Sequence, residues 1–208
     1  MKILITDDHA VVRQGLTRML GDEFKDATFG EASSSQEALE MVRHENWDVV
    51  ILDLGLPGRG GLEVLKDIHA DRPRLPVIIF SMYPEELYAV RVLQAGASGY
   101  LTKESAPELM ATAVRKVLTG GKYVSPSLAE RLANQLGDVS RQPHELLSDR
   151  EFEVLRLIGA GKTVSVIADE LSLSVKTVST YRARILEKMR LKTTAELIRY
   201  AIEHGWAD

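Results

Sequence analysis

Three carboxylates in the chain stand where short apolar runs end. Asp7 and Asp8 follow the run at residues 3–6, and Asp53 follows the run at residues 49–52. Short runs rich in branched side chains are typical of buried parallel strands, so we expect the three carboxylates at one edge of a sheet. Ligands of such sheets bind outside the carboxyl ends of the strands, and clustered carboxylates favour a divalent cation. The sequence therefore predicts a metal site with a candidate phosphoryl acceptor.

The composition limits the chemistry that such a site can use. The chain has 208 residues, 45% hydrophobic and 27% charged, which is typical of soluble globular protein with one large or two ordinary domains. It has no cysteine, so disulfides and thiolate metal sites are excluded. The apolar run after Met1 is too short for a signal peptide, and no apolar stretch approaches the length of a membrane span. We therefore expect a cytoplasmic protein with no membrane partner.

Charge is distributed unevenly along the chain. Residues 1–120 carry 13 Lys and Arg against 18 Asp and Glu, whereas residues 148–208 carry 10 against 9. Within the second range, residues 174–192 hold six basic side chains and one acid, Glu187. A local excess of positive charge on a helical segment suits a polyanion such as nucleic acid. The sequence thus joins an acidic part that suits a metal ion to a basic part.

The elements that must hold the carboxylates alternate along the first 120 residues. Strand-like runs are separated by stretches with helical periodicity, and they lie near residues 2–6, 28–32, 48–53, 76–81 and 98–102. This alternation predicts an α/β fold, a doubly wound sheet of five parallel strands with helices on both faces. The last helix begins at Pro107 and ends at Gly120-Gly121, so we expect the first domain to span residues 1–120.

A connector, residues 121–147, is expected to follow. A short helix there has Leu128, Leu132 and Leu136 on one face. Residues 138–147 have no clear periodicity and contain a proline, so we interpret them as a flexible linker.

From Ser148 to the end at residue 208 the pattern is wholly helical. Ser148 and Glu151 have the spacing of a capping box, in which each side chain satisfies a backbone N–H group of the other residue. Four helices are expected, near residues 149–159, 164–171, 175–190 and 194–204. We therefore predict an all-α second domain, residues 148–208.

Further residues complete the pattern of the first domain. The motifs are Asp7-Asp8-His9, Asp53, Gly55-Leu56-Pro57-Gly58, Ser81, Ala95-Gly96-Ala97, Tyr100 and Lys103. In this order they resemble the receiver domain of two-component response regulators, over roughly the first 120 residues. The resemblance implies a flavodoxin-like sheet with strand order 2-1-3-4-5.

A carboxylate can attack a phosphoryl group only if cations and hydrogen-bond donors neutralise the charge of the transition state. The resemblance implies that Asp53 is the phosphoacceptor. It also implies that Mg²⁺ is held by Asp8, Asp53 and the backbone carbonyl of Gly55, with Asp7 orienting it through water. His9 lies outside this minimal chemistry.

The resemblance gives three further residues a role in the phosphorylated state. Lys103 supplies a positive charge to one phosphoryl oxygen, and the hydroxyl of Ser81 donates a hydrogen bond to another. The movement of Ser81 lets Tyr100 turn inward, which changes a docking face. Gly55 departs from the family pattern, since a larger side chain is common there. Water should therefore reach the phosphorylated Asp53 more easily.

The second domain has its own pattern. Its motifs are Leu147-Ser148-Asp149-Arg150-Glu151, residues 154–158, Gly161-Lys162, Ile167-Ala168, Leu171 and residues 175–178. Over residues 147–204 they resemble the four-helix, helix-turn-helix DNA-binding domain of the NarL, FixJ and LuxR families. The turn is expected at Ser172-Leu173-Ser174, directly before the helix that reads DNA.

The two sides of that helix differ in character. Plotted at about 100° per residue, one side is apolar and carries Val178, Tyr181, Ile185, Leu186 and Met189. On the other side, we expect Lys176, Thr177 and Arg184 to contact phosphates. We expect Ser179, Thr180 and Ala183 to lie nearest the base edges. Arg182 projects toward the core side, so we expect it to pair with an acid, Glu151 or Glu170.

Together these features predict a transcription regulator controlled by phosphorylation. A sensor histidine kinase would load Asp53, the chain would form a homodimer, and the helical domain would bind double-stranded promoter DNA. The chain would not be an enzyme, beyond its own Mg²⁺-dependent phosphoryl transfer and dephosphorylation.

Two other classes of protein share some of these features. An Asp-based phosphatase also uses a strand-end Asp and Mg²⁺, but Asp53-Leu54-Gly55 lacks the second acid of its Asp-x-Asp motif. An adaptor could use the basic run to contact protein or RNA, although it has no aromatic platform for stacking single-stranded bases.

Overall fold

The structure is a computed structural model that describes residues 1–57, 59–105, 107–135 and 142–206. The chain divides into two compact units, Met1–Leu136 and Gly137–Asp208. In the part of the chain so described, no helix has both the length and the apolar character needed to cross a membrane.

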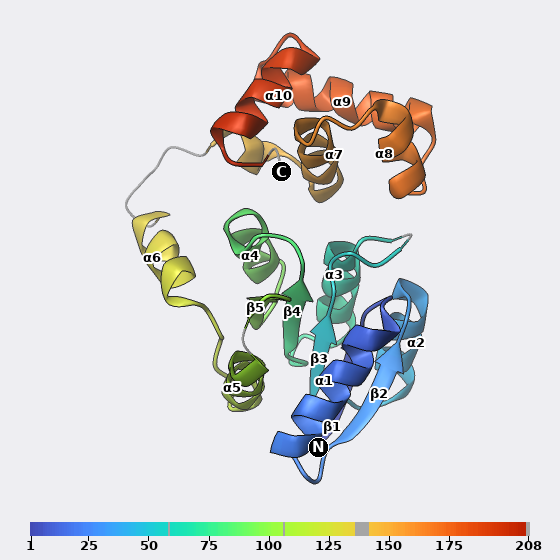
Figure 1. The fold of residues 1–208 in the computed structure, drawn as a ribbon, viewed down its shortest axis with the longest axis vertical. Helices are drawn as coiled ribbons and strands as arrows, with labels where there is room; N and C mark the ends of the chain where they lie inside the picture. The colour runs from blue at the N-terminus through green and yellow to red at the C-terminus, as the bar shows by residue number, and fades with distance from the viewer. Residues whose placement is uncertain (58, 106, 136–141, 207–208) are drawn as a thin grey trace. The chain divides into compact units, whose positions relative to one another are not determined.

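The first unit is built on one sheet of five parallel strands (Figure 1). The strands are β1 (Lys2–Thr6), β2 (Thr28–Ala32), β3 (Val49–Leu52), β4 (Val77–Ser81) and β5 (Gly99–Thr102). Their order in the sheet is β2-β1-β3-β4-β5, and every neighbouring pair is parallel. The predicted sheet and its strand order are therefore confirmed.

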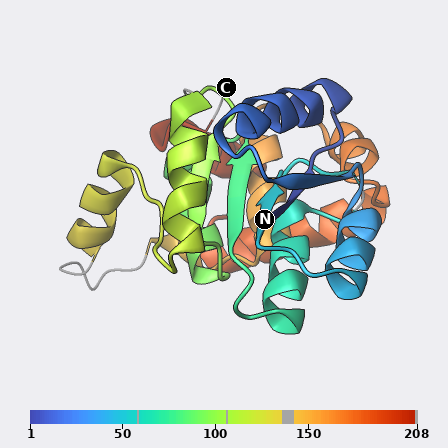
Figure 2. The same ribbon diagram turned by 90° about the horizontal axis from the view of Figure 1, so that it is seen from below.

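Helices cover both faces of this sheet. They are α1 (Ala10–Glu23), α2 (Ser35–His44), α3 (Gly61–Asp71), α4 (Glu85–Gln94) and α5 (Pro107–Leu118). Figure 2 shows α1 and α5 on one side of the sheet and α2 and α3 on the other. On the α1 and α5 side, Ile3, Ile5 and Ile51 pack with Leu20 and Val114, and all five are buried. Because alternate strand residues face opposite sides, the buried middle of β1, Ile3–Ile5, and the whole of β3 must be apolar, as their sequences are.

The connector contains one helix that belongs to the first unit. This helix, α6 (Pro126–Gln135), packs against α4, and its Leu128 is buried. Leu132 is half-buried on the same helix, while Leu136 lies outside the described residues.

The expectation of a flexible linker over residues 138–147 needs a correction. Residues 138–141 lie outside the described part of the chain, but Pro143–Leu146 forms a 3₁₀ helix, η1. Pro143 suits the first turn of a helix because its missing N–H needs no partner there. The His144 Nδ1 atom lies 2.8 Å from the Tyr200 hydroxyl, and its ring meets the Trp206 ring edge-on. These contacts hold the segment against the rest of the second unit.

The second unit is all-helical, as predicted. Its helices are α7 (Asp149–Gly159), α8 (Val164–Glu170), α9 (Val175–Met189) and α10 (Thr194–Glu203). The α7 helix contacts each of the other three, and its Phe152, Val154 and Leu155 are buried. The predicted capping box is present, with the Ser148 hydroxyl accepting from Glu151 N–H and the Glu151 carboxylate accepting from Ser148 N–H.

Candidate functional site

The sheet brings Asp7, Asp53 and Lys103 into direct contact. These residues directly follow β1, β3 and β5, and backbone hydrogen bonds extend the ladder past the strand ends. The Lys103 Nζ atom lies 2.7 Å from the Asp53 Oδ2 atom and 2.6 Å from the Asp7 Oδ2 atom. Parallel strands explain this meeting, because all of their carboxyl ends lie at one edge.

This cluster is buried and tightly coupled. Asp7 is 2% exposed and Asp53 is 4% exposed, so water can do little to screen their charges. Burial acts to lower the pKa of the Lys103 ammonium group, but its hydrogen bonds to Asp53 and Asp7 outweigh that effect and raise the pKa. Lys103 therefore remains a cation beside the two carboxylates.

Asp8 and His9 form the outer rim of the cluster. The Asp8 side chain is 35% exposed, and its Oδ1 atom lies 2.8 Å from the His9 Nδ1 atom. The His9 backbone N–H donates to Asp7 Oδ1 at 2.9 Å, which orients the inner carboxylate.

One residue at this rim was not predicted. The Arg13 guanidinium donates to the backbone carbonyl of Asp7 at 2.7 Å and to the Glu31 carboxylate at 2.9 Å. Its spacing, one helical turn after His9 at the start of α1, is the signal that could have indicated it.

The charges and donor atoms of the cluster fit a divalent cation. Lys103 contacts two carboxylates, Asp7 and Asp53, and a third, Asp8, lies beside them against His9, so negative charge remains to be neutralised. Their donors are oxygens, which Mg²⁺ prefers. The ligand atoms of Asp7, Asp8 and His9 lie within 4.8 Å of one another. The residues present therefore suit the magnesium ion that receiver domains generally use.

Gly55 lies directly beside the predicted acceptor. Its backbone N–H donates to the Asp53 Oδ1 atom at 3.1 Å. A Cβ atom at position 55 would stand 3.4 Å from the Asp53 Oδ2 atom, which is ordinary contact. The glycine thus leaves one side of the carboxylate uncovered.

Ser81 and Tyr100 are joined through the loop that follows β4. The Ser81 hydroxyl accepts a hydrogen bond from the Tyr83 N–H group at 3.3 Å, and the Tyr100 hydroxyl donates to the Tyr83 carbonyl at 2.7 Å. Tyr100 is 1% exposed, and burial raises the pKa of its hydroxyl. The tyrosine ring already points inward in this structure, whereas the sequence predicted that it turns inward after phosphorylation.

In the second unit, α9 presents the face that was predicted to read DNA. Lys176, Thr180, Ala183 and Arg184 are exposed, and Thr177 and Ser179 are half-buried. On the opposite face, Val178, Ile185 and Met189 are buried, and Tyr181 and Leu186 are half-buried. The predicted division of the helix into two faces is therefore present.

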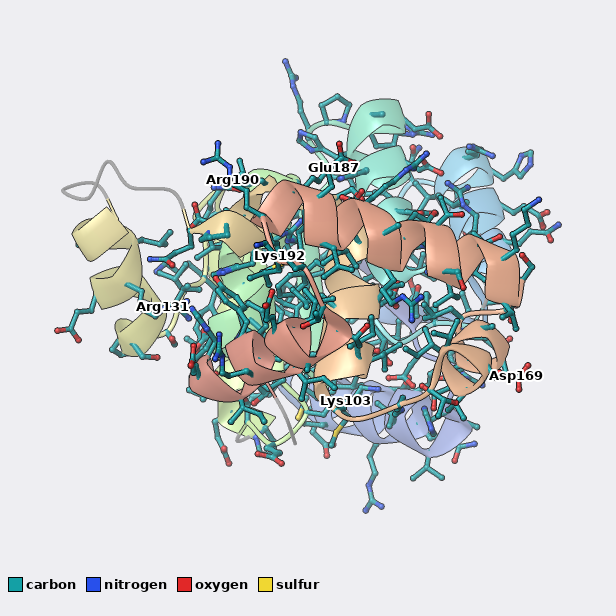
Figure 3. The ribbon with its side chains drawn as sticks, turned by 90° about the horizontal axis from the view of Figure 1, so that it is seen from above. Lys103, Arg131, Asp169, Glu187, Arg190 and Lys192 are labelled. Carbon is teal, nitrogen blue, oxygen red and sulfur yellow. The ribbon has the colours of Figure 1, made fainter. Side chains whose placement is uncertain are left out.

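The start of α9 is ordered by its own hydroxyl groups. The Ser174 hydroxyl caps the helix by accepting from the Thr177 N–H group at 3.0 Å. The Thr180 hydroxyl donates to the Lys176 carbonyl at 3.0 Å, so its acceptor lone pairs and its methyl group remain for a ligand. The last turn and the next loop add basic residues, and Figure 3 labels Arg190 and Lys192 there, near Glu187.

The expected partners of Arg182 are paired with other residues. Glu151 accepts a hydrogen bond from the Lys188 ammonium group at 2.6 Å, and Glu170 accepts from Lys162 at 2.7 Å. Arg182 is half-buried. Within the described residues Arg182 therefore pairs with neither acid, since Lys188 contacts Glu151 and Lys162 contacts Glu170.

Two family models match the chain, one in each unit. The receiver domain of response regulators matches residues 3–115, and the luxR family of bacterial regulatory proteins matches residues 145–201.

Whole-length relatives share both parts. Response regulator GacA of Pseudomonas syringae pv. syringae is 40% identical, with 100% of this chain and 98% of that protein covered. Response regulator UvrY of Escherichia coli is 35% identical, with 99% and 95% covered. Among solved structures, Salmonella enterica serovar Typhimurium RcsB bound to promoter P1flhDC with the phosphomimetic BeF₃⁻ has a TM-score of 0.68 at 28% identity, over 96% of this chain and 97% of that one. The chain belongs to the response regulators that join a receiver domain to a luxR-type DNA-binding domain.

Proposed function

We propose that Asp53 accepts a phosphoryl group from a sensor histidine kinase and that this event controls promoter binding by α9. Membership of the family makes the chain a phosphorylation-dependent transcription regulator. The observation that carries the assignment of Asp53 is its contact with Lys103, at 2.7 Å, in a buried cluster with Asp7.

The chain's own residues supply most of what phosphoryl transfer needs. A carboxylate oxygen of Asp53 attacks the phosphorus atom, and the leaving group, the kinase imidazole or acetate, departs with the bonding electron pair. Lys103 neutralises the charge on a phosphoryl oxygen, and the Gly55 N–H group holds the carboxylate that attacks. The Ser81 hydroxyl accepts from the Tyr83 N–H group and would donate its own proton to an oxygen of the phosphoryl group.

Asp8, Asp53 and the Gly55 carbonyl would hold the magnesium ion, with Asp7 orienting it through water. When bound, the ion neutralises negative charge on the phosphoryl oxygens. The half-exposed Asp8 suits an ion that keeps several of its waters.

The proposed output is binding of a homodimer to double-stranded promoter DNA. The structure of RcsB, a relative at 28% identity, has been solved with RcsB bound to a promoter in the presence of a phosphomimetic. That structure supports promoter DNA as the ligand of this chain and phosphorylation as the signal that controls binding. The exposed face of α9 supports Lys176, Thr177 and Arg184 as phosphate contacts, and Ser179, Thr180 and Ala183 as the residues nearest the bases. A protein with these partners would act in the bacterial cytoplasm.

A phosphatase function is less well supported. An Asp-based phosphatase needs an acid two residues after its nucleophile, and Gly55 occupies that position. We therefore propose that the only reactions at Asp53 are the chain's own phosphorylation and dephosphorylation.

The test is to replace the acceptor. Incubated with Mg²⁺ and radiolabelled acetyl phosphate, the wild-type chain should become labelled, whereas Asp53→Asn should remain unlabelled because an amide cannot form the acyl phosphate. Asp26→Asn, which changes an exposed acid away from the site, is the matched control and should label normally. Undiminished labelling of Asp53→Asn would refute the assignment.

A further inference from the structure

The connector that leaves the receiver unit runs along the edge of its sheet. The Tyr123 N–H group donates to the Ser98 carbonyl at 2.8 Å, and Tyr123 forms an isolated parallel bridge with Gly99. A Cβ atom on Gly99 would lie 3.1 Å from the Tyr123 Cβ atom, which is tighter than usual contact. The glycine at the start of β5 therefore lets the connector approach closely.

A single carboxylate holds the start of α6. The Glu85 Oε2 atom accepts hydrogen bonds from the Ser125 hydroxyl at 2.7 Å and from the Ser127 hydroxyl at 3.2 Å. The same Ser125 hydroxyl caps α6 by accepting from the Leu128 N–H group at 3.0 Å. Because Leu128 is buried, this arrangement fixes the first turn of α6 against α4.

Glu85 is also close in sequence to the residue expected to sense phosphorylation. It is the first residue of α4, four positions after Ser81. Between them, Tyr83 is tied to Ser81 through its N–H group and to Tyr100 through its carbonyl. A shift of this short loop toward Asp53 must therefore move Glu85.

We propose that Glu85 is a latch that holds the connector in the unphosphorylated chain and releases it when Asp53 is phosphorylated. This inference rests on the proposed function of Asp53. When the Ser81 hydroxyl donates to the phosphoryl group, the loop moves toward Asp53, and Glu85 moves with it. Figure 1 shows α4 between α6 and the central strands, so this movement carries the Glu85 carboxylate away from Ser125 and Ser127.

Release of the latch has a direct consequence for the output. The α6 helix is the last described element before the DNA-binding unit. Once its first turn is free, α6 is no longer held to α4 and can move as part of the connector. The receiver thus changes the freedom of the second unit through one carboxylate.

Hydrogen exchange of the whole chain, read in peptides that cover residues 123–133, tests the latch. In the wild-type chain, beryllofluoride with Mg²⁺ should raise the exchange rate of these amides by roughly three- to tenfold, the change expected from losing about one hydrogen bond. In Glu85→Ala, the same amides should exchange at the faster rate even without beryllofluoride. Adding beryllofluoride should change their exchange rate little. Glu86→Ala, at the adjacent exposed acid, should behave as wild type.

A second variant and an independent readout separate the outcomes. The double change Ser125→Ala with Ser127→Ala should reproduce Glu85→Ala, while unchanged exchange in β1 and β3 shows that each variant is folded. Equal exchange in Glu85→Ala and Glu86→Ala would overturn the latch, as would a wild-type chain that is labelled by acetyl phosphate but shows no change in residues 123–133. Failure of labelling itself would instead overturn the proposed function. The comparison of Glu85→Ala with Glu86→Ala would still test whether Glu85 restrains the first turn of α6 in the unphosphorylated chain.

Discussion

We expect Gly55 to set how easily water reaches the proposed acceptor, Asp53. A Cβ atom there would stand 3.4 Å from the Asp53 carboxylate, so a longer side chain can be added without a clash and would cover one side of the phosphoryl group. We expect Gly55→Gln to slow the loss of the phosphoryl group by roughly three- to tenfold, a barrier change of about 1 kcal/mol. The measurement is the decay of label after the phosphodonor is removed. The decay rate of Gly55→Ala should lie between those of the wild-type chain and Gly55→Gln. A decay as fast as in the wild-type chain would show that Gly55 has no such role.

At the scale of single residues, the sequence predicted the charged cluster but not the contacts that surround it. Asp7, Asp53 and Lys103 could be placed together because each follows a strand, and parallel topology brings strand ends to one edge. The Arg13 bond to the Asp7 carbonyl and the Tyr83 carbonyl that holds Tyr100 involve backbone atoms. Such partners depend on the path of a loop, which no residue pattern specifies.

Between elements, the Glu151 carboxylate joins α7 to α9. Burial acts to raise the pKa of this carboxyl, but the hydrogen bonds from Lys188 and Ser148 outweigh it and hold the pKa below its ordinary value of 4.5. A pKa that is lower in the folded state stabilises the fold above that value, and this stabilisation is lost as the pH falls through it and below. The helix that we propose reads DNA is therefore tied to the core of its unit by a hydrogen bond that acid breaks.

We expect Glu151→Gln to lower the free energy of unfolding of the DNA-binding unit by about 1–3 kcal/mol near neutral pH. The two proteins should converge in acid, because the wild-type carboxylate is then protonated as well. Urea titrations between about pH 7 and about pH 3 measure the difference. Fluorescence of the buried Trp206 reports this unit when Trp47 is replaced by Phe. A constant difference across the whole range would contradict the assigned linkage.

The exposed face of α9 leads to a prediction about sequence preference. Lys176→Ala should weaken binding to every duplex and lower the slope of log affinity against log salt by about one, because it would remove a proposed phosphate contact. Thr180→Ala should instead change which duplexes are preferred, with a difference of about 1–3 kcal/mol at the base pair that it contacts. Binding titrations on a panel of operator variants at several salt concentrations distinguish the two. Equal loss on all duplexes from both changes would remove Thr180 from the residues that read bases.

At the scale of elements, periodic segments were predicted well and the linker was not. The strands lie within one residue of their predicted ends, and the apolar stripe of α9 identified its buried face. Residues 143–146 were expected to be flexible because a 3₁₀ helix of four residues has no hydrophobic period to detect. What holds it is the contact of His144 with Tyr200 and Trp206, residues more than fifty positions away.

For the whole molecule, the receiver domain and the segment around α9 differ in charge in a way that suits their ligands. Residues 1–120 have a net charge of −5, whereas residues 174–192 have a net charge of +5. An acidic receiver is itself repelled by DNA, so the affinity for a promoter must come from the basic run. One α9 helix presents few phosphate contacts, and two copies on paired half-sites would double them.

Phosphorylation should therefore change both the mass and the salt dependence of the DNA complex. With beryllofluoride and Mg²⁺, we expect the molecular mass in solution to approach twice that of one chain. The slope of log affinity against log salt on a two-half-site duplex should also rise about twofold, since each released counterion reports one phosphate contact. Light scattering and binding titrations measure the two quantities, and Asp53→Asn should respond in neither. If the slope doubled while the mass stayed that of one chain, DNA itself would be assembling the pair, and phosphorylation would act on the freedom of the DNA-binding unit rather than on dimerisation.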